Sequence, residues 1–333
     1  MKYFFFIIAF FSSAYSQQFS DTTLHKIIAQ GVEYTVQQQY DSAKFIFRTI
    51  IKKYPTHPLG YLYLTGTLQA EFSDYENFVD ENLQDSLLTI GIDLAEKFIE
   101  KNPNDAWGYY YKGTGLAFRA FLKTQRSGWF GAIFDGTSSA SSFEQCLQLN
   151  PKFYNAMSGL GTYYYWKSRV PFFTNQEEEG ITLLKNAVSN ASFDSHIAHN
   201  SLIEILIDAQ RYDEALHYVQ SGLTKYPNNR SLLWQAVTIY EKKQNKNELK
   251  KMVPRLLSSI INAPTINYYR EILCRLKLSR YAMNAKEYDA VIKECMIMLS
   301  YKNNSQKIYK NIDKKLEEAN ILLQKAKIEI AKK

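Results

Sequence analysis

Prolines recur at regular intervals in this sequence, and each of them follows an amphipathic stretch. Pro55, Pro103 and Pro151 are 48 residues apart, and Pro227 stands in the same setting. Between them apolar residues recur at spacings of three and four, which indicates helices, and the alternation typical of strands is nearly absent. Since proline cannot continue a helix, it marks a position just beyond a helix end. We therefore expect an all-α chain of repeated helical units.

The segments before two of these prolines share one spacing. Gly31, Tyr34, Ala43, Phe47 and Pro55 align with Ile203, Leu206, Ala215, Val219 and Pro227. This pattern resembles the tetratricopeptide repeat, a helix–turn–helix unit of 34 residues, and the resemblance covers most of 24–229. In that family, small residues at the eighth and twentieth positions let the paired helices approach closely. The resemblance implies a right-handed superhelical solenoid of antiparallel helix pairs.

The domain organisation follows from the extent of the pattern. We expect the solenoid over 17–229, and further helical pairs over 230–333 where the signature fades. About six pairs are expected in all, with a lysine-rich terminal helix from about residue 305. The resemblance implies a scaffold and no particular chemistry, because the family is defined by its architecture.

The spacing of 48 residues exceeds the repeat of 34 by 14 residues, and this excess occurs twice. The additional residues fall at 71–84 and 123–136, between the first and second helices of the second and third units. A third insertion, 168–178, stands at the same place in the fourth unit. Insertions at one point of a solenoid repeat lie along one edge. We therefore expect a row of elaborations on a single rim.

The amino terminus has the features of a secretory signal peptide over residues 1–16. Lys2 precedes an apolar run over 3–11, and Ala14-Tyr15-Ser16 fits the cleavage pattern. The run is too short to span a bilayer, and no later stretch is apolar for 18 residues. We expect an exported protein, periplasmic or secreted, with no transmembrane span in the mature chain.

Charge is distributed unevenly along the chain. Residues 240–333 hold 21 Lys and Arg against 10 Asp and Glu, whereas 17–239 hold 18 against 23. A basic tail often indicates nucleic acid, but export argues against a nucleic-acid partner. An anionic envelope surface or an acidic partner is the binding interpretation, and a solvated lysine-rich surface is the structural one.

No catalytic motif, metal site or cofactor site is predicted. His196 and His199 lie one helical turn apart and His217 lies on the next helix, but no motif supplies further ligands in register. The acidic run Glu177–Glu179 begins a helix, where the dipole stabilises carboxylates. We therefore expect a protein that is not an enzyme.

Three cysteines are scattered along the chain and form no disulfide framework. Cys274 and Cys295 stand about equally far from Asn284, a predicted turn between helices, so they could face each other. Two buried thiols and a disulfide both remain open.

Aromatic residues are the most unusual feature, with 25 Tyr, 20 Phe and 4 Trp, and they concentrate at 107–121 and 163–173. In the tetratricopeptide family the first helix of each unit lines a concave face. The resemblance implies partner contacts at Trp107, Tyr110, Phe118, Asn155, Tyr165 and Trp166, and at Asn200 and Trp234 later in the chain. Rings with polar tips suit a peptide groove or a sugar-stacking surface. The alternative is that the rings pack helix on helix.

The glycine-bracketed stretch 127–136 adds Trp129 and Phe130 to this set. Its rings either fold down as a short helix over the core or form a contact patch at the groove edge. The leading interpretation is a non-catalytic, exported scaffold that binds a peptide or protein in the cell envelope. A glycan-binding or glycan-processing protein and an outer-membrane assembly factor are the alternatives.

Overall fold

Helices make up most of the chain. The computed structural model describes residues 22–76, 80–126, 128–171, 173–303 and 312–332, which hold fifteen α-helices and one short 3-10 helix. The helices are α1 Thr22–Val36, α2 Tyr40–Lys53, α3 Pro58–Tyr75, α4 Glu81–Lys101, α5 Ala106–Gln125, α6 Trp129–Leu149, α7 Tyr154–Ser168, α8 Glu177–Asn190, α9 Ser195–Asp208, α10 Tyr212–Lys225, α11 Arg230–Lys242, α12 Lys246–Ile261, α13 Tyr268–Asn284, α14 Tyr288–Ser300, η1 Tyr301–Asn303 and α15 Ile312–Ala331. These residues contain no strand, which confirms the all-α prediction.

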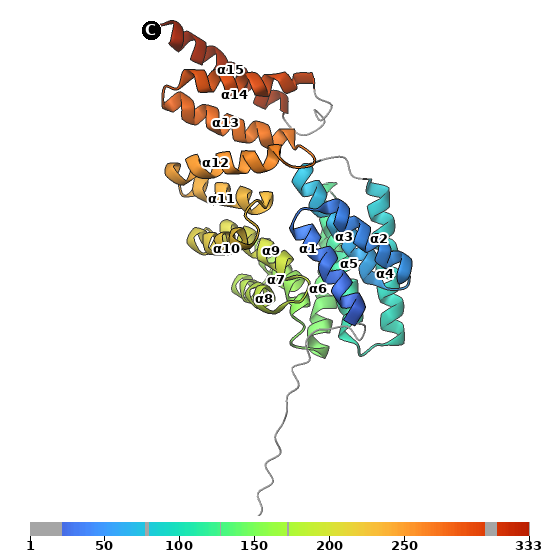
Figure 1. Cartoon of the computed structure of the whole chain (residues 1–333). Helices are drawn as coiled ribbons and strands as arrows, with labels where there is room; N and C mark the ends of the chain where they lie inside the picture. The colour runs from blue at the N-terminus through green and yellow to red at the C-terminus, as the bar shows by residue number, and fades with distance from the viewer. Residues whose placement is uncertain (1–21, 77–79, 127, 172, 304–311, 333) are drawn as a thin grey trace, which may run out of the picture.

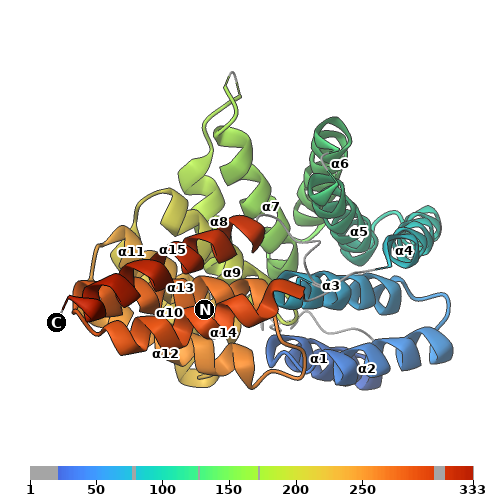
Figure 2. The ribbon, with the colours of Figure 1, turned by 90° about the horizontal axis from the view of Figure 1, so that it is seen from above.

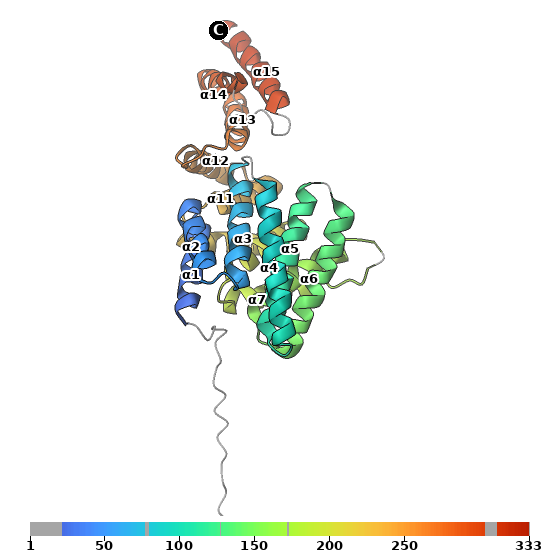
Figure 3. The same cartoon turned by 90° about the vertical axis from the view of Figure 1, so that its right-hand side faces the viewer.

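Consecutive helices pack as antiparallel pairs that follow one another in a superhelix (Figure 1). The described residues form seven pairs, from α1–α2 to α13–α14, rather than about six. The terminal helix α15 packs on α13 and α14 at the carboxyl end (Figure 3). Its described part is Ile312–Ala331. Residues 304–311, near the predicted start of the terminal helix, lie outside the described residues, as do residues 1–16 of the predicted signal peptide. Among the residues described, no helix is both long and apolar enough to cross a membrane.

The prolines of the sequence stand where the helix ends were predicted. Pro55, Pro103, Pro151 and Pro227 each follow the last residue of a helix by two positions. The next helix often begins with a side-chain cap, as where the Asp105 carboxylate accepts a hydrogen bond from the Trp107 amide over 2.9 Å. Such caps satisfy amides that have no partner within the helix. Loop residues therefore define both the end of one unit and the start of the next.

Small residues mark the points of closest approach between paired helices. A Cβ atom on Gly31 would lie 2.6 Å from the ring of Phe47, and Ala43 beside it is fully buried. In the fourth unit a Cβ atom on Gly161 would lie 2.6 Å from the carbonyl oxygen of Gly180. The close contact of α7 and α8 is therefore one of backbone with backbone.

Gly161→Ala is expected to destabilise the protein by about 1–3 kcal/mol, because the added methyl group meets a carbonyl that cannot move alone. Gly136→Ala is the matched control, since its Cβ would lie 3.8 Å from the Tyr163 ring. The control should be neutral or gain up to about 1 kcal/mol from helix propensity. Urea unfolding measures both variants, and equal changes would contradict the proposed close contact.

Where the structure describes them, the first two insertions mostly lengthen the helices on either side. Helices α3 to α6 have 18, 21, 20 and 21 residues, whereas α9 to α12 have 14, 14, 13 and 16. Within the inserted stretches Tyr75 and Ala132 are buried, and Leu87 and Leu122 are buried close beside them. The third insertion, as far as it is described, is mostly the loop between α7 and α8. The α5–α6 and α7–α8 hairpins project on the same side of the molecule (Figure 2).

The superhelix closes on itself, because its first units contact its fifth to seventh. The hydrogen-bonded pairs that join them are Tyr226 with Glu33, Asn229 with Val36, Arg230 with Asp74, Asn267 with Asp74 and Arg270 with Ser73. Figure 2 shows α1 to α3 beside the stacked carboxyl-terminal pairs. This closure determines which faces of the helices a partner can reach.

Candidate functional site

The interior of the superhelix, where the sequence placed a partner groove, is filled by the chain itself. Residues 192–194, which join α8 to α9, lie against the first helices of units two to four. The Phe193 ring is buried, with its centroid 6.2 Å from that of Tyr63 and 6.4 Å from that of Trp107. Tyr110 is fully buried beneath the same segment.

The side chain of Asn155 holds the backbone of this segment. Its side-chain oxygen accepts hydrogen bonds from the amides of Phe193 and Asp194 over 3.0 and 3.2 Å, and its Nδ2 donates to Ser192 over 3.0 Å. Asn155 is itself fully buried. The contact expected between Asn155 and a partner is thus made with the protein's own chain.

The Asp194 carboxylate meets two tyrosine hydroxyls in this interior. Tyr63 and Tyr110 each donate a hydrogen bond to one of its oxygens over 2.8 Å. Burial raises the pKa of Asp194 to about 6, although the two tyrosine hydrogen bonds oppose this shift. Burial and the nearby carboxylate raise the pKa values of both tyrosines well above their usual range. Sequence reasoning missed this cluster because Tyr63 and Asp194 are far apart along the chain.

Of the two aromatic residues predicted as contacts in unit four, Tyr165 lies in the core and Trp166 lies at the surface. Tyr165 is fully buried, and its hydroxyl donates to Asp208 over 2.7 Å. Burial, followed by this hydrogen bond, raises the pKa of Tyr165 to about 12. The guanidinium of Arg169 lies 4.9 Å from the centre of the Tyr165 ring. The neighbouring Trp166 is 43% exposed, so only Trp166 of the pair faces solvent.

The other predicted contact residues come from three different helices and are all half-buried. Phe118 is half-buried against Gly66, and its carbonyl accepts from Gln69. Asn200 is half-buried on α9, and Trp234 is half-buried on α11. The Arg270 guanidinium lies 5.2 Å from the Trp234 ring centre. Because Tyr110, Asn155 and Tyr165 are fully buried, the predicted residues do not all line one open groove.

Large apolar side chains gather instead at the ends of the two projecting hairpins. We call these residues the tip patch: Phe130, Ile133 and Phe134 on α6, and Trp166, Val170 and Phe173 on α7 and the loop after it. Their exposed fractions run from 43% for Trp166 to 93% for Phe130. The α6 residues form a helix, but their side chains do not fold down over the core. Trp129 begins this helix, and its side chain lies outside the described residues.

Contacts between α6 and α7 fix how the two halves of the tip patch face each other. A Cβ on Gly159 would touch the Phe143 ring, and Thr137 and Tyr163 form a hydrogen bond over 3.1 Å. Continuing this antiparallel register toward the tips places Ile133 level with Trp166. The apolar residues of both hairpins therefore lie toward the ends that project on the same side of the molecule (Figure 2).

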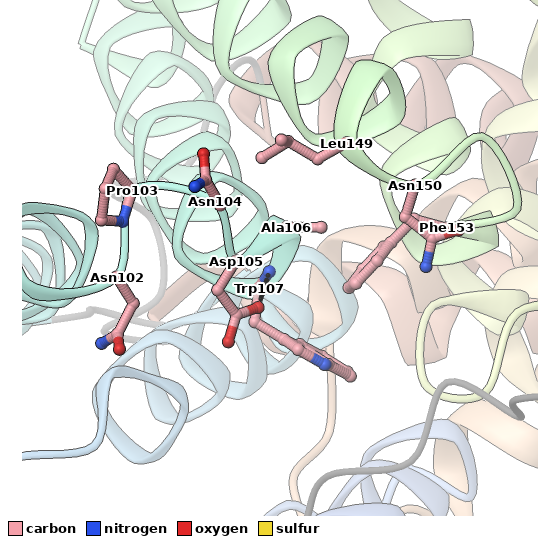
Figure 4. A pocket seen from close by; sticks show the side chains of 9 residues that line it. All are labelled: Asn102, Pro103, Asn104, Asp105, Ala106, Trp107, Leu149, Asn150 and Phe153. Carbon is pink, nitrogen blue, oxygen red and sulfur yellow. Dashed lines mark hydrogen bonds between the residues drawn. The ribbon is translucent and has the colours of Figure 1, made fainter.

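A shallow pocket of about 590 Å³ lies beside Trp107, on the loops that join units two, three and four (Figure 4). It is lined by Asn102, Pro103, Asn104, Asp105, Ala106, Trp107, Leu149, Asn150 and Phe153. The Trp107 indole packs edge-on against Phe153, with ring centroids 4.7 Å apart. Amide and carboxylate groups thus surround one partly exposed indole.

Histidines and cysteines serve the packing of the described residues. Among these residues no group of three or more His, Cys, Asp and Glu could hold a metal ion. His196 contacts the Phe193 carbonyl through Nδ1 over 2.9 Å, and burial lowers its pKa to about 4. All three cysteines are buried free thiols, so Cys274 and Cys295 form no disulfide.

Comparisons with known proteins support the fold and nothing finer. No protein-family model matches the sequence, and no curated protein matches it. The Cut9–Hcn1 hetero-tetramer of the APC/C has 15% identity and a TM-score of 0.53, over 90% of this chain and 55% of that one. TTC0263, a thermophilic TPR protein of Thermus thermophilus, has 18% identity and a TM-score of 0.42, over 64% of this chain and 97% of that one. YrrB, a TPR protein with an unusual peptide-binding site, has 16% identity and a TM-score of 0.39, over 65% of this chain and 93% of that one. The chain has the fold of a tetratricopeptide-type solenoid.

Proposed function

We propose that this tetratricopeptide-type solenoid is a non-catalytic, exported scaffold that binds a peptide or protein partner in the cell envelope. The observation that carries the proposal is the tip patch, in which six large apolar side chains are exposed at the ends of two hairpins that pack on each other. Contiguous apolar surface is costly in water and marks interaction sites in folded proteins. Aromatic anchors such as Phe130 and Trp166 supply much of the binding energy at such sites.

The hairpin that carries half of the patch is held rigid from beneath. The Asp135 side chain is almost fully buried, where Arg119 donates to it over 2.8 Å and Lys123 pairs with it over 2.6 Å. Burial alone would raise the pKa of Asp135, but these two cations outweigh burial and hold it below its usual range. The first turns of α6 are thus fastened to α5. A surface ordered in advance loses less entropy on binding, which favours the tip over a loose loop.

Replacing Phe130 and Phe134 by serine is expected to reduce partner capture at least tenfold and to leave the melting temperature nearly unchanged. Both rings are mostly exposed, at 93% and 71%, so little packing is lost. Phe45→Ser is the matched control, because Phe45 is 70% exposed on the distant helix α2. Pull-down from envelope extract, followed by titration of the purified partner, measures the effect. Equal binding by the variant and the control would exclude the tip patch.

A glycan ligand is the second candidate, and the pocket beside Trp107 favours it. Asn102, Asn104 and Asn150 place amides around an indole, a combination that suits hydrogen bonding and stacking to a sugar. Purified protein tested on a glycan array distinguishes the candidates. Saturable glycan binding that needs no protein and is lost in Asn104→Ala would favour this candidate, whereas binding confined to a protein partner would favour the first.

We further propose that residues 240–333 contact an anionic partner or surface. Lys314, Lys325 and Lys327 on α15 are exposed, and no ion pair among the described residues includes them. Attraction through exposed charges weakens as salt rises, because the Debye length falls from about 10 Å at 0.1 M to about 3 Å at 1 M. This contact would assist the tip patch and would not replace it.

A further inference from the structure

Three parts of the superhelix meet at the Asp194 carboxyl group. Asp194 precedes α9, Tyr63 comes from α3 and Tyr110 from α5. Each pair among these three groups is joined by an oxygen–oxygen contact of 2.8 Å. Such distances are those of hydrogen bonds between oxygens, so each contact needs one hydrogen atom.

The number of hydrogen atoms depends on whether Asp194 is ionised. When the carboxylate is ionised, the two tyrosine hydroxyls supply only two hydrogen atoms for the three contacts. One pair of oxygens then lies 2.8 Å apart with no hydrogen atom between them. With a protonated carboxyl group there are three hydrogens, and a closed ring of three hydrogen bonds is possible. A buried oxygen pair without a hydrogen is unfavourable, so the geometry favours the protonated form.

No cationic side chain among the described residues is paired with the Asp194 carboxylate. None of the ion pairs among the described residues includes Asp194, and its side chain does not cap α9. Packed around the segment are the His25 ring, 4.6 Å from the Phe193 ring, the neutral Asn155 amide, and His196. Burial lowers the pKa values of both histidines, so they are neutral at pH 7. Burial also raises the pKa of Asp194 to about 6.

We propose that Tyr63, Tyr110 and Asp194 form a pH-sensitive latch that holds residues 192–194 in the interior of the superhelix. Protonated Asp194 closes the latch, because all three contacts are then hydrogen bonds. Ionised Asp194 loosens it, because one contact becomes repulsive and the buried charge favours hydration. Loosening would expose the faces of Tyr110 and Asn155 that the segment covers. This control goes beyond the proposed partner binding and does not depend on it.

The direction and size of the effect follow from proton linkage. The closed state binds the Asp194 proton more tightly than an opened state in which the carboxyl group is hydrated and has its ordinary pKa of 3.8. Raising the pH therefore favours opening through the range between the two pKa values. From pH 5 to pH 7.5 the opening equilibrium should increase about tenfold.

Hydrogen exchange of the full chain tests the latch at the Phe193 and Asp194 amides, which donate to Asn155. After correction for intrinsic rates, the opening equilibrium should be about tenfold larger at pH 7.5 than at pH 5. Asp194→Asn should lose this difference, because an amide does not ionise. Asp208→Asn is the control, since Asp208 also accepts from a tyrosine but pairs with Arg169. The same pH response in Asp194→Asn as in the wild type would overturn the proposal.

A second measurement can be made on the wild-type protein alone. In wild-type protein labelled at aspartate carboxyl carbons, nuclear magnetic resonance should show one group that titrates near pH 6. Selective loss of that signal in Asp194→Asn assigns it where the variant folds. If every aspartate titrates below pH 5, the latch is excluded.

Discussion

Replacing Arg230 by methionine is expected to lower the free energy of unfolding by about 3–5 kcal/mol. Arg230 begins α11, and its Nε lies 2.9 and 3.0 Å from the two carboxylate oxygens of Asp74 on α3. The two side chains are only 10% and 5% exposed. Methionine fills much of the same volume but leaves the Asp74 charge buried. The Tyr40 hydroxyl and backbone contacts cannot compensate that charge. Urea unfolding at pH 7 measures the change.

A double variant separates the buried charge from the lost contact. Arg230→Met combined with Asp74→Leu should recover most of the stability, because a buried ion pair replaced by apolar groups is often neutral. The surface pair Arg211–Glu178 is the comparison, since Glu178 is 80% exposed and such pairs contribute about 0–1 kcal/mol. If Arg230→Met costs no more than Arg211→Met, the pair does not stabilise the closure of the superhelix.

The local parts of the fold could be predicted from the sequence, because their signals lie within single units. Pro55 and Pro227 mark helix ends by a property of proline itself. Gly31 opposite Phe47 reports a close approach within one helix pair. The insertions at 71–84 and 123–136 were predicted only as elaborations between two helices, and most of their described residues lengthen those helices. Length alone did not distinguish a longer helix from a longer loop.

The closed interior could not be predicted, because it depends on contacts between distant units. The resemblance implies a concave face that is open, and by that rule Tyr110 and Asn155 are accessible. The structure buries both of them under Phe193 and Asp194. Nothing near residue 193 in the sequence indicates where the superhelix brings it. By contrast, an exposed contact patch at Phe130 was one of the two sequence hypotheses, the other being that its stretch folds down over the core.

Trp107→Ala and Trp166→Ala should differ in their effects on stability and on binding, although the sequence placed both residues in one contact surface. Trp107 packs against Phe153, Tyr110 and Phe193 at centroid distances of 4.7, 5.6 and 6.4 Å. Its removal leaves a cavity beside the interior segment and should cost about 3 kcal/mol. Trp166 is 43% exposed and contacts one ring, that of Tyr165. Its removal should cost less than about 1 kcal/mol.

Measuring both stability and binding for these two variants decides where the contact surface lies. If the tip patch binds the partner, Trp166→Ala loses affinity at nearly unchanged melting temperature. Trp107→Ala should melt early, and below its melting temperature it should bind the partner about as well as the wild type. If the Trp166 variant melts as early as the Trp107 variant, Trp166 belongs to the core and not to a contact surface. The surface would then have to be sought on α6 alone, where Phe130 is almost entirely in solvent.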